Sequence, residues 1–300
     1  MQRPSYLALF KSGELEHRIG RLDRILGECT LCPRRCQINR LGGGIGICQA
    51  GPMLTVSSYF PHFGEERELV GRAGSGTIFL SHCNLRCSFC QNYDISHLGV
   101  GEQISTQRLA RMMLHLQQQG CHNINFVTPT HYAPQIISAL PLAIEMGLEL
   151  PLVYNCGGYE SLEVIELLEG IIDIYMPDAK FSSPKYAQQF ANAPNYFEVL
   201  KPVLKEMHRQ VGVLKIDADG IAYQGLLIRH LVMPNDVAGS EKILKFIAEE
   251  LSPESYVNIM NQYRPCFEAV DEPFINRRIS SQEYNQVLDL AKGFGLHRGF

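Results

Sequence analysis

The sequence predicts an α/β protein in which short apolar strands alternate with amphipathic helices from residue 76 onward. Apolar residues make up 45% of the 300 residues, enough for a sizeable buried core. Six short runs rich in β-forming residues are each followed by a segment with helical spacing. Such repeats build a parallel sheet with crossover helices, and they leave open whether the sheet stays open or closes partly into a barrel.

The elements follow one another in a regular order. The predicted strands occupy residues 76–84, 123–130, 150–156, 171–181, 225–234 and 256–265. The predicted helices occupy residues 105–120, 133–147, 161–170, 195–212, 239–251 and 280–293. Pro141 is expected to kink the second helix, and Ser280 with Glu283 forms a capping box at the start of the last one. Residues 1 to about 70 lack this pattern and are expected to be irregular. We therefore expect a small cysteine-rich metal-binding segment over 1–73 and the repeated α/β unit over 74–300.

Composition excludes several classes of protein. The formal net charge is −4 and the sequence pI is about 6.2, which does not favour a nucleic-acid partner. No run of 18 apolar residues is present, so no membrane helix is expected. The apolar stretch near the N-terminus is too short for a signal peptide, and we expect a cytoplasmic protein.

Three closely spaced cysteines follow the first predicted strand. Cys83, Cys87 and Cys90 have the spacing C-x3-C-x2-C. They follow the carboxyl end of the first predicted strand, and active sites of parallel α/β proteins lie at this end of the strands. Three thiolates can hold three irons of a 4Fe-4S cluster and leave the fourth iron open for an exchangeable ligand. The alternatives are a structural zinc site completed by His82 or His97, or a group of free thiols.

A second group of cysteines lies in the N-terminal segment. Its members are Cys29, Cys32, Cys36 and Cys48, spaced C-x2-C-x3-C-x11-C. The pattern predicts a second metal centre, either zinc or an auxiliary iron–sulfur cluster. Arg34, Arg35 and Arg40 flank this group, and a solvated face is favoured for them over contact with an acidic partner or a reductant. The remaining cysteines, Cys121, Cys156 and Cys266, are expected to be small buried hydrophobes.

The motif carries a family resemblance. With Phe89 before its last cysteine, the phrase CNLRCSFCQN resembles the radical S-adenosylmethionine (SAM) superfamily, and within it the branch that activates glycyl radical enzymes. The N-terminal CTLCPRRCQINR…GICQAG is similar to iron–sulfur homologues of pyruvate formate-lyase activating enzyme. The resemblance implies a partial (β/α)6 TIM-like barrel, a 4Fe-4S cluster, and reductive cleavage of SAM to a 5′-deoxyadenosyl radical that abstracts a hydrogen atom.

The resemblance also implies binding residues at the ends of later strands. Asp178 and Lys180 would complement the SAM ammonium and carboxylate, unless they form a plain surface ion pair, and Arg229 would lie near the SAM carboxylate or ribose. His230 points to the opposite face and is expected to pack. The family's glycine-rich segment ending in glutamate is replaced here by NFVTPTHY. The candidate SAM contacts that remain are Asn125, Thr128, Thr130 and Asn155, with Gly157 and Gly158 beside the cavity.

Three functions follow from these patterns. The resemblance implies an oxidoreductase that activates a glycyl radical enzyme and takes electrons from a flavodoxin or ferredoxin. A radical SAM enzyme that modifies a small molecule or another peptide stays open, because the second-strand segment and the N-terminal cysteines depart from the activase pattern. A structural metal-binding protein without catalysis is disfavoured, because the three-cysteine motif lies at the catalytic end of a strand.

Overall fold

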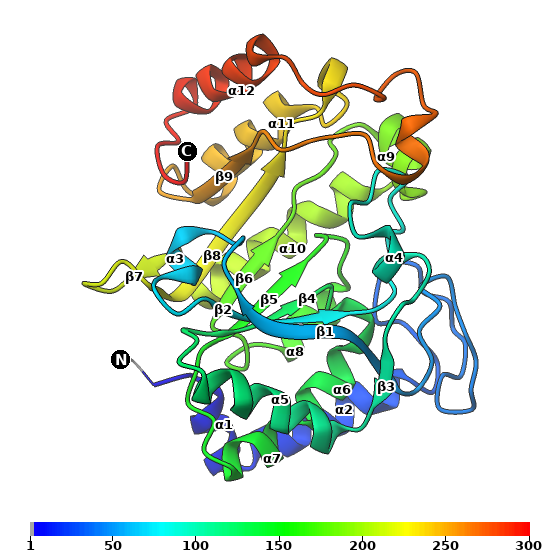
Figure 1. The fold of residues 1–300 in the computed structure, drawn as a ribbon, viewed down its shortest axis with the longest axis vertical. Helices are drawn as coiled ribbons and strands as arrows, with labels where there is room; N and C mark the ends of the chain where they lie inside the picture. Colours follow the sequence, from blue (N-terminus) through cyan, green and yellow to red (C-terminus); the bar gives the residue numbers. More distant parts are fainter. Residues whose placement is uncertain (1–2) are drawn as a thin grey trace.

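The computed structural model describes residues 3–300 and is built around one mixed sheet (Figure 1). Its nine strands in these residues are β1 (Leu54–His62), β2 (Ser75–Leu80), β3 (Glu102–Ile104), β4 (Ile124–Val127), β5 (Leu152–Cys156), β6 (Ile174–Pro177), β7 (Lys215–Ile216), β8 (Ala222–Leu231) and β9 (Tyr256–Met260). Their order in the sheet is β3-β1-β2-β4-β5-β6-β8-β7, and β9 also pairs with β8.

All six predicted strands are present as β2, β4, β5, β6, β8 and β9, and each pairs in parallel with the next. The sheet is not closed, since within residues 3–300 β9 is paired through β8 and β2 pairs on its other side with β1. The carboxyl ends of the parallel strands therefore lie at one rim, where side chains from strands far apart in the sequence can meet.

Helices cover the outside of the sheet and connect its strands (Figure 1). They are α1 (Tyr6–Ser12), α2 (Glu14–Ile25), α3 (Arg67–Val70), α4 (Tyr93–Ser96), α5 (Thr106–Gln118), α6 (Ala133–Ser138), α7 (Leu140–Glu145), α8 (Leu162–Leu167), α9 (Pro184–Ala191), α10 (Tyr196–Val211), α11 (Ser240–Phe246) and α12 (Ser281–Gly293). Short 3-10 or π turns are η1 (Thr130–Tyr132), η2 (Pro234–Asp236), η3 (Ile247–Leu251) and η4 (Phe267–Val270). As expected, the predicted helix over 133–147 is interrupted before Pro141, and the capping box of α12 is formed.

The expectation that residues 1 to about 70 are irregular is wrong for residues 6–25 and 54–70, and it is confirmed for residues 26–53, which contain no helix or strand. Helix α2 buries Leu15, Ile19 and Leu22. Their spacing is typical of an amphipathic helix, and the interpretation of this segment as a cysteine-rich loop missed it. Strand β1 pairs antiparallel with β2 and with β3. The division at residue 73 stays a prediction, and β1 joins the sheet of the larger part across that boundary.

The concave side of the sheet changes from apolar to polar along the strands. Its lower layer holds Val153, Ile174 and Leu227, which pack against Leu69 of α3. The strand ends above carry charged and amide side chains, because alternate residues of a strand face the same side. Among the described residues, no helix has both the length and the apolar character that crossing a membrane needs.

Candidate active site

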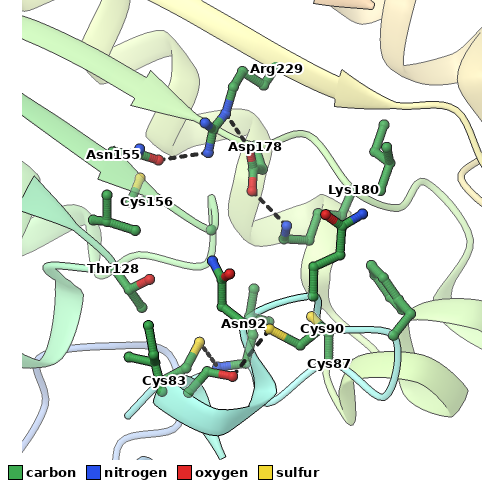
Figure 2. A pocket seen from close by; sticks show the side chains of 18 of the residues that line it. Cys83, Cys87, Cys90, Asn92, Thr128, Asn155, Cys156, Asp178, Lys180 and Arg229 are labelled. Atoms are coloured by element: carbon green, nitrogen blue, oxygen red, sulfur yellow. Dashed lines mark hydrogen bonds and ion pairs between the residues drawn. The ribbon is translucent and has the colours of Figure 1, made fainter. Parts of the chain in front are cut away.

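A cavity of about 230 Å³ opens at the carboxyl ends of the parallel strands (Figure 2). The three cysteines of the motif line one side, and polar residues from β5, β6 and β8 line the other (Figure 2). The predicted site residues that the structure brings together here are Cys83, Cys87, Cys90, Thr128, Asn155, Asp178, Lys180 and Arg229. Cys156 and Gly157, which follow Asn155, also line the cavity.

The three cysteines belong to a loop between β2 and α4 that is well packed against the rest of the chain. Phe89 stacks edge-on against Phe181, with ring centroids 5.9 Å apart. The Leu85 N–H donates to Cys83 Sγ at 3.4 Å, and the Ser96 hydroxyl donates to Cys90 Sγ at 3.1 Å. Such hydrogen bonds to sulfur are typical of the surroundings of iron–sulfur clusters and tune their potentials.

Burial also sets the chemistry of these thiols. Burial raises the pKa of Cys83 and of Cys87 above the ordinary thiol value. Free thiolates are therefore disfavoured in this loop, and a metal that binds them must supply the compensating positive charge.

The opposite side of the cavity is a network of charges centred on Asp178. Its Oδ2 accepts from Lys180 Nζ at 2.6 Å, and its Oδ1 accepts from Arg229 Nε at 2.7 Å (Figure 2). Arg229 also donates to Asn155 Oδ1 at 2.6 Å. Burial by itself would raise the pKa of Asp178, but the two cations outweigh it and lower the pKa below the ordinary value. Asp178 and Lys180 therefore belong to a buried network of charges and do not form an ion pair on the surface.

The network makes Arg229 a positioning residue as much as a binding one. Its third contact is Glu65, whose Oε2 lies 3.4 Å from Arg229 Nη1. Each of the three guanidinium nitrogens thereby faces a carboxylate or an amide oxygen of the protein. Among residues 3–300 Lys180 pairs with one carboxylate, that of Asp178, and it faces the cysteine loop across the cavity (Figure 2). Of the two cations, Lys180 is the better placed to meet a bound anion.

The backbone that carries Asp178 and Lys180 is held by Tyr196. The Tyr196 hydroxyl accepts from the Lys180 N–H at 3.1 Å and lies 2.8 Å and 2.7 Å from the Gly157 and Asp178 carbonyls. Gly158 has φ +75°, and a Cβ there would lie 2.3 Å from the Asp178 carbonyl oxygen. Only glycine permits this close approach between the ends of β5 and β6.

Two predicted SAM contacts do not line the cavity. Asn125 is fully buried and both its side-chain polar atoms lack a partner in residues 3–300. Asn125 pairs with Val153 of β5, which lies two residues before Asn155 in the strand. Asn125 is therefore farther from the rim of the sheet than Asn155. Thr130 donates instead to Glu160 at 2.8 Å. His230 packs as expected, with its ring nitrogens 2.7 Å and 2.8 Å from the Ala179 carbonyl and the Ser240 hydroxyl.

The structure adds four residues to the site that no sequence pattern indicates. Glu65 begins a run of four charged residues, 65–68, that continues into α3 and shows no periodicity. The rim of the cavity carries three exposed amides, Gln91, Asn92 and Gln262. Their type is ordinary for a surface, and only their shared place at the cavity distinguishes them.

The N-terminal cysteines lie together at the same end of the sheet. All four line a second, small cavity with Arg40 and His131. The expectation of a solvated face is wrong for two of the three arginines. Arg40 is fully buried. Arg34 donates from Nε to the Asn84 carbonyl at 3.0 Å and from Nη2 to the Ala191 carbonyl at 2.8 Å. Arg34 therefore ties the N-terminal loop to the loop of the three-cysteine motif, whereas Arg35 is exposed.

These residues fit the cofactors expected from the sequence. Three thiols on one loop are the soft donors that iron–sulfur clusters take, and in residues 3–300 the cavity has no fourth cysteine from that loop. Cys83, Cys87 and Cys90 would hold the cluster, and the wall of Asn155, Asp178 and Lys180 offers both signs of charge to the amino and carboxylate groups of SAM.

Fold and site together define an α/β enzyme whose three-thiol loop and charged wall share one cavity at the strand ends. A sequence profile of the radical SAM superfamily matches residues 77–221, which include the three cysteines, Asp178 and Lys180. An uncharacterised protein of Methanocaldococcus jannaschii is 33% identical over 300 residues, covering 97% of this chain and 82% of the relative. The chain belongs to the radical SAM superfamily. Membership implies a 4Fe-4S cluster and reductive cleavage of SAM to a radical.

Two solved structures show limited similarity of fold. Methylornithine synthase aligns with a TM-score of 0.49 at 13% identity, covering 72% of this chain and 62% of that one. Native anSMEcpe with bound AdoMet aligns with a TM-score of 0.46 at 11% identity, covering 71% of this chain and 57% of that one. The chain thus spans less than two thirds of the length of either solved protein.

Proposed function

We propose that the protein abstracts a hydrogen atom from a glycine residue of a partner protein, as an activase of a glycyl radical enzyme. The observation that carries the proposal is the rim of the cavity, where Gln91, Asn92 and Gln262 present exposed amides. An amide side chain offers a donor and an acceptor at once, which matches the alternating groups of an extended peptide backbone. The Gln91 amide already lies 3.4 Å from the Gln262 carbonyl, a bond that a peptide strand can replace.

The charge of the cavity supports an uncharged target. The formal charges of Lys180 and Arg229 are balanced by those of Asp178 and Glu65 in and beside the inner wall. The residues nearer the rim are amides and apolar groups, among them Leu231 and Met260. A glycine brings no side chain, so its α-carbon can approach closely in a narrow space.

The chain's own residues would prepare the reaction in three ways. When bound, a reduced cluster and SAM supply a radical able to take a hydrogen atom from carbon. Cys83, Cys87 and Cys90 would hold the cluster, while Asp178 and Lys180 would orient SAM through its charged groups. Phe89 within the cysteine loop packs against Tyr263, and both rings are buried and exclude water from the loop.

Two further components belong to the proposal. A flavodoxin or ferredoxin would supply the single electron that each cleavage of SAM consumes. The four N-terminal cysteines would hold a second metal centre, because they line one common cavity beside the cysteine loop.

The chemistry is tested by measuring 5′-deoxyadenosine in anaerobic protein that has been reconstituted with iron and sulfide, reduced with dithionite and mixed with SAM. The expected result is product from the wild-type protein and only background from Cys87→Ala. Cys121→Ala is the matched control, because Cys121 is equally buried but lies outside both cysteine groups. Loss of product in both variants would show that the assay reports protein damage and not cluster loss.

The target is tested with peptides that carry deuterium on one α-carbon. Transfer of deuterium from glycine, but not from alanine in the same peptide, into 5′-deoxyadenosine is expected. Gln91→Ala and Asn92→Ala should weaken this transfer more than they weaken uncoupled SAM cleavage. Equal transfer from both peptides, or from neither while a small molecule donates its hydrogen, would refute the activase role and leave the radical chemistry intact.

A further inference from the structure

The N-terminal loop is folded so that its four cysteines face one space. The Cys29 N–H donates to the Ile38 carbonyl at 2.9 Å, and the Gln37 N–H donates back to the Cys29 carbonyl at 3.0 Å. Gly46 passes so close to Cys36 that a Cβ there would lie 3.0 Å from the Cys36 sulfur. These contacts hold Cys29 beside residues 37–38 and bring the segment before Cys48 against Cys36, without a disulfide in residues 3–300.

A buried positive charge lies against this space. Arg40 is fully buried and lines the cavity beside Cys48. Its Nη1 and Nη2 donate to the carbonyls of His131 and Gly51, each at 2.6 Å, and its Nε has no partner in the part of the chain that the structure describes. Neither the His131 side chain nor the carbonyl groups of His131 and Gly51 carry a negative charge that could balance Arg40. A buried charge requires a counter-charge, and metal-bound thiolates would provide it, since four of them exceed the charge of any divalent ion.

The spacing of the thiols distinguishes a single ion from a cluster. Four sulfurs around one zinc ion each lie about 2.3 Å from it, which leaves no room for another atom between them. In residues 3–300 no three Cys, His, Asp or Glu side chains are gathered closely enough to share one metal ion, so the four thiols do not form a zinc tetrahedron.

The same is true of the loop whose cofactor the family implies, because in the described residues Cys83, Cys87 and Cys90 are not gathered closely enough to share one metal ion either. In an iron–sulfur cluster each cysteine binds a different iron or shares one with a single neighbour, so the thiols stand apart around a core.

We propose that Cys29, Cys32, Cys36 and Cys48 bind an iron–sulfur cluster, and that the guanidinium of Arg40 is its buried counter-charge. All four ligand positions are filled by the protein, so this cluster has no open iron and does not bind SAM. The inference specifies the second metal centre proposed above and does not depend on the radical chemistry of the other cluster.

The test uses the full-length triple variant Cys83→Ala, Cys87→Ala, Cys90→Ala, which removes the family's cluster and leaves the N-terminal loop intact. After anaerobic purification and reconstitution, we expect about two or four iron atoms per chain with matching sulfide, and an EPR or Mössbauer signal of a cluster. Stoichiometric zinc without sulfide, or no bound metal in a protein whose circular dichroism is native, would overturn the proposal. Because this variant cannot cleave SAM, its iron content is independent of the activase test.

The role of Arg40 is tested by redox titration of the same triple variant. Reduction adds an electron to the cluster, and a nearby buried cation favours the reduced form. Arg40→Gln should therefore shift the midpoint potential of the N-terminal cluster to more negative values, and Arg40→Lys should shift it less. Arg35→Gln is the matched control, since Arg35 is exposed at the same loop. Equal shifts in Arg40→Gln and Arg35→Gln would overturn the assignment of the counter-charge.

Discussion

Removing the charge of Asp178 should destabilise the protein by an amount that the geometry of its network determines. In Asp178→Asn, Lys180 and Arg229 lose a carboxylate that lies 2.6 Å and 2.7 Å from their nitrogens. The side chains of the three residues are only 16% to 18% exposed, so water cannot replace that carboxylate fully. Removing one member of a buried pair costs about 3–5 kcal/mol. The partial exposure and the Glu65 carboxylate place the expectation at the lower end, about 3 kcal/mol.

The assay is urea unfolding of the metal-free protein under reducing conditions, followed by circular dichroism. The double variant Asp178→Asn, Lys180→Met removes both members of the closer pair, and Arg229 then keeps Glu65 as its partner. We expect the double variant to be less destabilised than the sum of the single variants by about 2 kcal/mol. The exposed pair Glu102 and Arg108 is the control, and Glu102→Gln should change the free energy of unfolding by less than about 1 kcal/mol.

Two outcomes would refute this reasoning. A loss below about 1 kcal/mol in Asp178→Asn would mean that the two cations find other counter-charges or water. Additivity of the single variants within about 0.5 kcal/mol would mean that Asp178 and Lys180 do not interact in the folded protein.

Two more predictions concern groups that support the site. Tyr196→Phe removes the only acceptor shown for the Lys180 N–H in the described chain and should cost about 1–3 kcal/mol in urea unfolding, whereas an unchanged midpoint would show that water takes over the bond. Burial raises the pKa of Asp173 from 3.8 to about 6, so folding favours its neutral form. The contribution of Asp173 to the free energy of unfolding is fully present below about pH 4. It decreases by about 3 kcal/mol in total as the pH rises through 6. Unfolding of the wild type relative to Asp173→Asn should show this loss between pH 4 and 6, and parallel pH profiles would contradict it.

The part of the fold that the sequence predicted is the part where local pattern and burial agree. Each of the six parallel strands is a short apolar run, and its end is marked by a change to polar residues. Asp178, Lys180 and Arg229 could be predicted for the same reason, because the ends of parallel strands meet at one rim.

The errors arise where the outcome depends on partners far away in the sequence. Glu65 lies between β1 and α3 and contacts Arg229 because β1 pairs with the sheet. The residues next to Glu65 in the sequence do not indicate this contact. Arg40 was expected in solvent, as arginines ordinarily are, but the loop closes over it. Asn125 is the second residue of β4 and Asn155 the fourth residue of β5, and the register between the two strands shows how far below the rim Asn125 lies.

The contact of Arg34 with the carbonyl of Asn84 has a consequence for how the protein acquires its cofactors. The Arg34 side chain connects the two cysteine loops. Ordering either loop therefore removes part of the entropy cost of ordering the other loop. Linkage of this kind is reciprocal: if filling the N-terminal site strengthens binding at the second loop, filling the second strengthens the first by the same factor. Under the proposal of a second metal centre, each site can still be filled alone, but molecules with both sites filled should be more frequent than independent binding would give.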